Sequence, residues 1–181
     1  MILSVQNVSK SFGTDEILKN VSFHIEDHEK AAVVGINGAG KSTLLKIIVG
    51  ELTPDTGEVI TAKGKSLGYL AQHQDLEGDR TIEEELLSVK SDVIAMEQKI
   101  RAMEEQMHHV EGAELEKLLE DYNRMHHQFE LEGGYSYRSE VYGVLNGLGF
   151  SQEDYQKKIS QLSGGQKTRV ALGRLLVTKP D

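Results

Sequence analysis

The sequence contains no cysteine, which excludes disulfide bonds and metal sites built from thiolates. It also has no apolar run close to the roughly 20 residues that a membrane-spanning helix needs. Residues 1–5 show neither the basic start nor the long apolar stretch of a secretory leader. With 38% hydrophobic and 27% charged residues in a chain of 181, the composition predicts one globular domain with a real core, soluble and cytoplasmic.

The net charge of −9 is unevenly distributed. Residues 82–132 hold 14 acidic and 5 basic side chains, whereas the rest of the chain holds 15 of each sign. The whole acidic excess therefore lies in one segment. We interpret this segment as an insertion into a domain of balanced charge.

The first part of the chain has the pattern of strands and turns. Alternating polarity in residues 3–8 and 21–25 predicts half-buried strands, and residues 58–61 and 67–70 are also strand-like. The unbroken apolar run at 31–34 is typical of a strand buried on both faces of a parallel sheet. A glycine-rich loop follows this run and leads into a helical pattern at 44–48. These features predict an α/β fold with a mixed sheet as its core.

From about residue 81 the apolar period becomes helical. Two stripes repeat with spacings of 3, 4, 3 and 4 residues: Val93, Met96, Ile100, Met103 and Met107, then Leu115, Leu118, Tyr122, Met125 and Phe129. Two such helices joined by a short turn at 111–112 predict an antiparallel coiled-coil hairpin, which Gly133 and Gly134 end.

Other residues of this segment are better explained as ordinary structure than as sites. The histidine pairs at 108–109 and 126–127 are interpreted as solvated, and the methionines as packing on the seam, rather than as metal ligands. Residues 83–85 are expected to be a solvated helix start. Four further glutamates are expected to face water: Glu97, Glu104, Glu116 and Glu120.

Residues 35–42, GINGAGKS, match the pattern G-x-x-x-x-G-K-[ST] at every fixed position. Glycines allow the backbone N–H groups to wrap around phosphate, Lys41 supplies positive charge, and the Ser42 hydroxyl can bind Mg²⁺. A chance glycine-rich turn and a Rossmann loop are weaker explanations, because the latter gives Lys41 no role. The expected nucleotide-binding residues are Gly35, Asn37, Gly38, Ala39, Gly40, Lys41, Ser42 and Thr43.

The pentapeptide at 162–166, LSGGQ, resembles the signature of the ATP-binding-cassette (ABC) family. In that family it follows a P-loop (Walker A) motif, as it does here. Gln72 resembles the glutamine of the family's Q-loop, which reaches Mg²⁺ and the attacking water. Phe12 resembles the aromatic residue that stacks on adenine, although an ordinary core phenylalanine is the alternative.

The resemblance implies ATP and Mg²⁺ as cofactors. Two cassettes of this family enclose two ATP molecules, and the signature of one meets the Walker A motif of the other. By this resemblance Lys41 and Gln72 are catalytic, and Ser42 and Gln72 bind the metal. The signature residues would contact ATP held by a second cassette: Ser163, Gly164, Gly165 and Gln166.

The run from Leu162 to Leu176, with residues 148–150 before it, looks like the ABC-F subgroup. Members of that subgroup carry two cassettes in one chain, have no transmembrane partner and act on the ribosome, as translation factors or in antibiotic protection. They carry an inserted helical hairpin, the arm. We therefore expect an ATP-binding core at 1–80, the arm at 81–134 and a helical subdomain with the signature at 135–181.

The sequence departs from the family's pattern in two respects. The family continues beyond the equivalent of Asp181 into the Walker B strand, which lies beside the strand expected at 31–34, and into the catalytic glutamate. We therefore expect the first part of a cassette, nearly inactive by itself and with exposed core. The acidic hairpin also argues against broad contact with RNA phosphates. Two alternatives to a ribosome factor remain: the cassette of a membrane transporter, and a structural fragment without activity of its own.

Overall fold

The computed structural model describes residues 1–71, 76 and 78–180. Gln72, the predicted Q-loop residue, lies outside the described residues. The chain divides into two compact units, one formed by Met1–Tyr69 with Pro180 and the other by Leu70–Lys179. Each unit has its own hydrophobic core, and each is described separately below.

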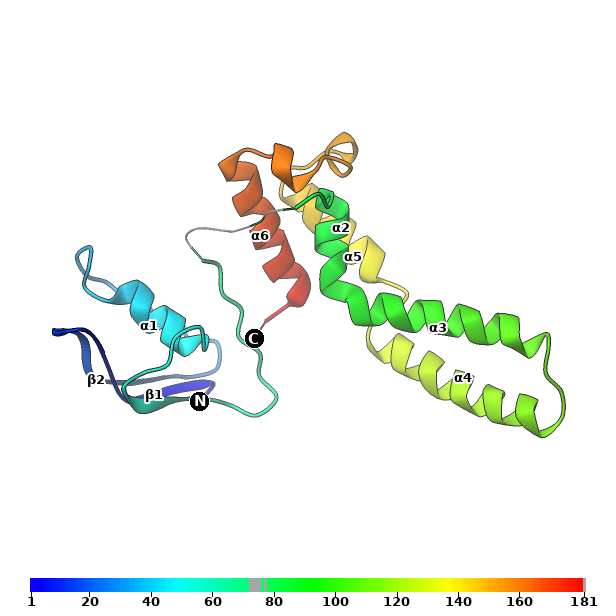
Figure 1. Cartoon of the computed structure of the whole chain (residues 1–181), viewed down its shortest axis with the longest axis horizontal. Helices are drawn as coiled ribbons and strands as arrows, with labels where there is room; N and C mark the ends of the chain where they lie inside the picture. Colours follow the sequence, from blue (N-terminus) through cyan, green and yellow to red (C-terminus); the bar gives the residue numbers. More distant parts are fainter. Residues whose placement is uncertain (72–75, 77, 181) are drawn as a thin grey trace. The chain divides into compact units, whose positions relative to one another are not determined.

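The first unit is a three-stranded antiparallel sheet in the order β2-β1-β3. The strands are β1 (Leu3–Phe12), β2 (Asp15–Ile25) and β3 (Thr56–Thr61), so the strands predicted around 3–8, 21–25 and 58–61 are confirmed. Helix α1 (Lys41–Ile48) carries the predicted apolar stripe and packs on the sheet (Figure 1). The buried residues of this core are Val5, Val8, Leu18, Leu44 and Ile47.

The strands predicted at 31–34 and 67–70 are wrong. Both segments lack regular structure. Val34 is 90% exposed, and Ile36, just after the first segment, is 82% exposed. An apolar run becomes a buried parallel strand only where other strands flank it and satisfy its backbone groups. All strand pairings in the described part of the chain are antiparallel and leave this run outside the sheet. Val33 and Val34 are therefore exposed rather than part of a buried strand.

The second unit is helical. Its subdomain consists of α2 (Ile82–Leu87), η1 (Ser88–Lys90), α5 (Tyr137–Gly147), η2 (Gln152–Asp154), η3 (Ile159–Gln161) and α6 (Gly164–Thr178). The helix predicted from about 165 to 177 is thus confirmed. The most deeply buried side chains of the subdomain are Ile82, Leu86, Val141, Leu145, Ile159, Val170 and Val177.

The predicted hairpin is present. Helix α3 (Ser91–Met107) and helix α4 (Ala113–Leu131) lie side by side and are joined by residues 108–112 (Figure 1). Ile100 is buried on the seam in one cluster with Tyr122, Met125 and Phe129, as the spacing predicted. Of the two stripes, Val93, Ile100 and Phe129 are buried and the other members are half-buried. Tyr137 of α5 and Leu87 of α2 belong to the same cluster, so the base of the hairpin packs on the subdomain as well as on itself.

Two expectations about acidic residues are wrong. Glu97 is not simply solvated, because it accepts a hydrogen bond from the Tyr137 hydroxyl at 2.7 Å and pairs with Arg101 and Arg138. The hydrogen bond from Tyr137 lowers the pKa of Glu97. The guanidinium groups of Arg101 and Arg138 lower this pKa further, whereas burial raises it. Glu97 thus ties the first hairpin helix to α5. Charge alone could not reveal Tyr137 and Arg138 as partners, because they come from another helix.

The helix start at 83–85 is also more than a solvated acidic turn. Glu83 accepts hydrogen bonds from Tyr142 and Gln156, and Glu84 completes a capping box with Thr81. Glu85 is 7% exposed. The partners of Glu83 and Glu85 lie far away in the sequence, so a run of three glutamates did not indicate them, whereas the T-x-x-E spacing of Thr81 and Glu84 is a local signal of a capping box.

Candidate nucleotide-binding site

The loop that precedes α1 is shaped by glycines. Gly38 and Gly40 have φ angles of 86° and 87°, in the left-handed region that side chains disfavour. A Cβ atom at Gly40 would lie 2.8 Å from the Ile17 side chain and 3.0 Å from that of Leu18. Gly40 therefore lets the loop backbone press against β2 while it turns into the helix.

The Lys41 ammonium lies on the loop itself. Its Nζ donates hydrogen bonds to the carbonyl oxygens of Gly35 at 2.8 Å and Ile36 at 2.7 Å. An ammonium group has one further N–H to give. The two carbonyls hold the positive charge at the mouth of the glycine loop, where a phosphate oxygen could accept that third hydrogen bond.

The start of α1 is open to an anion. Its N-cap, Gly40, provides no side-chain cap, and the first turn contains no acidic residue. The first N–H groups of a helix have no intrahelical partner and attract negative charge. Ser42 is exposed in this turn and Thr43 is half-buried, while Asn37 and Ala39 lie exposed in the loop. The loop and the helix start together can hold phosphate.

Phe12 is the last residue of β1 and is 52% exposed. The alternative of a core phenylalanine is therefore wrong. The Lys10 ammonium lies 5.8 Å from the ring centroid, and one face of such an exposed ring is available for stacking.

The signature begins α6. Ser163 is its N-cap, with the hydroxyl accepting from the Gln166 N–H at 3.3 Å and its own N–H donating to the Gln166 side chain at 2.9 Å. This capping box uses Gln166 as a structural residue. The Ser163 O–H remains a donor, and open space surrounds the Cα atoms of Gly164 and Gly165. Those glycines leave the backbone at the helix start accessible.

Arg169 of the signature helix contacts the segment at 148–150, which also carries the family resemblance. Its guanidinium donates to the Leu148 carbonyl at 3.0 Å and lies 4.9 Å from the centre of the Phe150 ring. The segment at 148–150 is thereby fastened to the second turn of the signature helix. The sequence resemblance pointed to these residues but not to the contact between them.

The structure brings the P-loop residues together in the first unit and the signature residues together in the second. In the described part of the chain, no group of three or more His, Cys, Asp or Glu side chains could hold a metal ion. Likewise, none of the helices described is both long and apolar enough to cross a membrane.

Comparison with known proteins establishes the class. The family model described as "ABC transporter" matches residues 18–181, and the chain therefore belongs to the ATP-binding-cassette family. Within that family it is most like the F subgroup, since its relatives include ABC transporter F family member 2 of Arabidopsis thaliana, 29% identical over 180 residues. That match covers 98% of this chain and 26% of the Arabidopsis protein.

Bacterial relatives are more similar. The Bacillus subtilis protein YdiF is 51% identical over 181 residues, which are 100% of this chain and 28% of YdiF. The energy-dependent translational throttle protein EttA of Escherichia coli is 32% identical over 167 residues, covering 91% of this chain and 29% of EttA. The chain thus spans less than a third of the length of these relatives.

The fold agrees with this assignment. The solved ATP-binding subunit of an ABC transporter superimposes with a TM-score of 0.67 at 19% identity, covering 99% of this chain and 63% of that subunit. The predicted α/β cassette fold is confirmed.

The first prediction concerns Gly40. Changing Gly40 or Gly38 to Ala forces a side chain into the left-handed region, at a cost of about 1–2 kcal/mol. Only Gly40→Ala also collides with Ile17 and Leu18, which adds about 1–3 kcal/mol. Urea unfolding of the intact parent protein should show a clearly larger loss for Gly40→Ala. Equal losses for the two variants would mean that the loop does not need this close approach.

Proposed function

We propose that residues 35–43 bind the phosphates of ATP together with Mg²⁺, and that the intact parent protein hydrolyses this ATP. The observation that carries the proposal is the uncapped start of α1 beneath a loop in which Lys41 is held by two carbonyls. A nest of N–H groups with one lysine and one serine hydroxyl is a donor set for a metal-bound polyphosphate.

Each residue has a distinct role in this proposal. Gly38 and Gly40 give the loop its curvature, and the backbone N–H groups from Gly38 to Ser42 surround the phosphates. Lys41 gives its third N–H to the terminal phosphates and stabilises charge that develops on them. Phe12 stacks on the adenine ring.

The residues present also fit Mg²⁺. The Ser42 hydroxyl is exposed at the first turn of α1, and Mg²⁺ commonly takes few protein ligands beside phosphate oxygens and water. When bound, the ion would neutralise phosphate charge. By family resemblance Gln72 would be a second ligand.

The signature is proposed to act on a second cassette. The free O–H of Ser163 and the open backbone at Gly164 and Gly165 form a helix start suited to the γ-phosphate of ATP bound elsewhere. Gln166 contributes by holding this start in shape. A second cassette, in the parent chain or in a dimer mate, is therefore the partner we propose.

We further propose that the parent acts on the ribosome through the hairpin, with the core at 1–80, the arm at 81–134 and the signature subdomain at 135–181. In support, the apolar stripes of α3 and α4 face each other, with Ile100 and Phe129 buried in one cluster. The name of EttA places that relative in translation. The transporter cassette stays the alternative, because the matching family model bears a transporter's description.

The charge of the hairpin restricts how such an arm could bind. Two of its few basic residues are already paired, Arg101 with Glu97 and Arg124 with Asp121. Binding through many phosphate contacts is therefore disfavoured. We propose that the arm acts through its length and shape, with local contacts near its tip.

The second prediction tests the phosphate site. Lys41→Ala in the intact parent should abolish hydrolysis and weaken ATP binding at this cassette, since a charge-assisted contact contributes about 1.5–3 kcal/mol. Lys46→Ala, an exposed lysine of the same helix, is the control and should bind normally. Unchanged ATP affinity of Lys41→Ala by calorimetry would remove Lys41 from the site.

The third prediction concerns the chain by itself. The 181 residues should show negligible ATP turnover, because the family's Walker B aspartate and catalytic glutamate have no counterpart in them. Phosphate release with and without Mg²⁺ measures this. A magnesium-dependent rate equal to that of the parent would contradict it.

The fourth prediction tests the arm. Replacing Ile100 and Tyr122 with Asp places charge on the seam and should unfold the hairpin while leaving the P-loop unit intact. In the parent, this variant should lose co-sedimentation with ribosomes but keep ATP binding.

The matched control for the arm carries Asp at Gln98 and Asn123, which are exposed on the same two helices and add the same charge. It should still co-sediment. If the Ile100 and Tyr122 variant also co-sediments unchanged while hydrogen exchange shows an unfolded hairpin, the arm does not bind the ribosome.

A further inference from the structure

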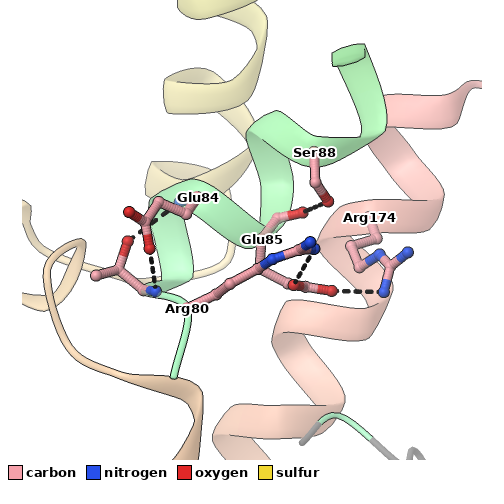
Figure 2. A network of polar contacts seen from close by, with 6 residues as sticks. Arg80, Glu84, Glu85, Ser88 and Arg174 are labelled. Atoms are coloured by element: carbon pink, nitrogen blue, oxygen red, sulfur yellow. Dashed lines mark hydrogen bonds and ion pairs between the residues drawn. The ribbon is translucent and has the colours of Figure 1, made fainter. Parts of the chain in front are cut away.

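Glu85 is a buried carboxylate that the proposed chemistry does not use. It lies on α2 and is 7% exposed. Its Oε1 accepts a hydrogen bond from Arg174 of α6 at 2.6 Å, and its Oε2 lies 3.5 Å from the Arg80 guanidinium (Figure 2). Each carboxylate oxygen is therefore paired with a different arginine.

Burial makes this pairing costly to break. A carboxylate removed from water is tolerated only when its charge is compensated, and loss of one partner leaves an uncompensated buried charge. Arg174 makes the short contact with a side chain that is 44% exposed, whereas Arg80 makes the longer one with a side chain that is 64% exposed. Arg174 is therefore the principal partner of Glu85.

The contact lies where α2 and α6 approach closely. A Cβ atom at Gly173 would lie 3.2 Å from Leu86 of α2 and 3.0 Å from Leu148. Apolar contacts at this point allow one helix to slide or rotate on the other, because dispersion and hydrophobic attraction are not directional. The hydrogen bond between the Arg174 guanidinium and the Glu85 carboxylate favours one orientation of α6 relative to α2, because hydrogen bonds weaken steeply when misaligned.

The other end of α6 is the signature. Ser163 caps the helix that carries Arg174, about 16 Å away along the axis at 1.5 Å per residue. A helix of this length moves as a rigid body, so a rotation at Arg174 is carried to Ser163. Rigid placement within a fraction of an ångström is what such a phosphate contact requires.

We infer that Glu85 is a positioning residue, which fixes the orientation of the signature helix through Arg174 and thereby controls the rate of ATP turnover without contributing to ATP binding. This inference rests on the proposed function, in which Ser163 acts on ATP held by a second cassette. Glu85 itself touches neither nucleotide nor metal in this assignment.

The test uses the intact parent protein with Glu85→Gln, which keeps the shape of the side chain and removes its charge. We expect kcat to fall about tenfold, as for loss of a charge-assisted contact expressed in the transition state. KM and the affinity for ATP should change less than twofold. Glu85→Asp, which retains the charge, should recover part of the rate. Glu153→Gln, an exposed acid of the same subdomain, should leave both constants unchanged.

A double-mutant cycle with Arg174→Met separates positioning from general stability. If the pair acts as a unit, Glu85→Gln with Arg174→Met should be no slower than the slower single variant. Unchanged kcat in Glu85→Gln, additive losses in the cycle, or a parallel loss of kcat, ATP affinity and helix content would each overturn the inference. Lys41→Ala, measured beside these variants, shows separately whether the proposed ATP site is correct.

Discussion

The close approach of the loop backbone to β2 at Gly40 is the constraint on which the candidate site depends. It lets α1 begin against the sheet, with its first N–H groups and Lys41 at the mouth of the loop. The core residues Leu44 and Ile47 then fix α1 on β1 and β2. A side chain at Gly40 would push the helix start away from the sheet, and the anion site would lose its support. The binding chemistry therefore follows from packing rather than from the lysine alone.

In the second unit, the hairpin of α3 and α4 is held by apolar packing and by polar contacts at its base. Two amphipathic helices can cover part of their apolar surface by pairing, and α3 and α4 do so along a seam that buries Ile100 and Phe129. Polar contacts at its base complete the attachment, because Glu97 accepts from Tyr137 and pairs with Arg138 on the segment that returns to the subdomain. These contacts join α3 to α5 by hydrogen bonding and charge pairing in addition to apolar packing.

Periodicity and motif spacing predicted much of this structure. Alternation identified β1 and β2, and the two stripes identified α3 and α4, because one-sided burial imposes a period on the sequence. The glycine-rich loop was predicted from its spacing, since only glycine tolerates the geometry seen at Gly38 and Gly40. The strand predicted at 31–34 is absent from the structure. Its apolar residues favour a buried position, but a buried strand also requires neighbouring strands to which its backbone groups can hydrogen-bond.

The acidic residues show a deeper limit of sequence reasoning. Three adjacent glutamates have three different environments. Glu83 accepts hydrogen bonds from a tyrosine and a glutamine, and Glu84 closes a capping box. Glu85 is buried and pairs with two arginines. Helical geometry turns successive side chains through about 100°, so neighbours meet different surroundings. The partner of each carboxylate is decided by the groups that its direction meets: Tyr142 and Gln156 for Glu83, the N-cap residue Thr81 for Glu84, and Arg174 of α6 for Glu85. Because α6 begins at the signature, a residue outside every motif is joined to the helix that presents one.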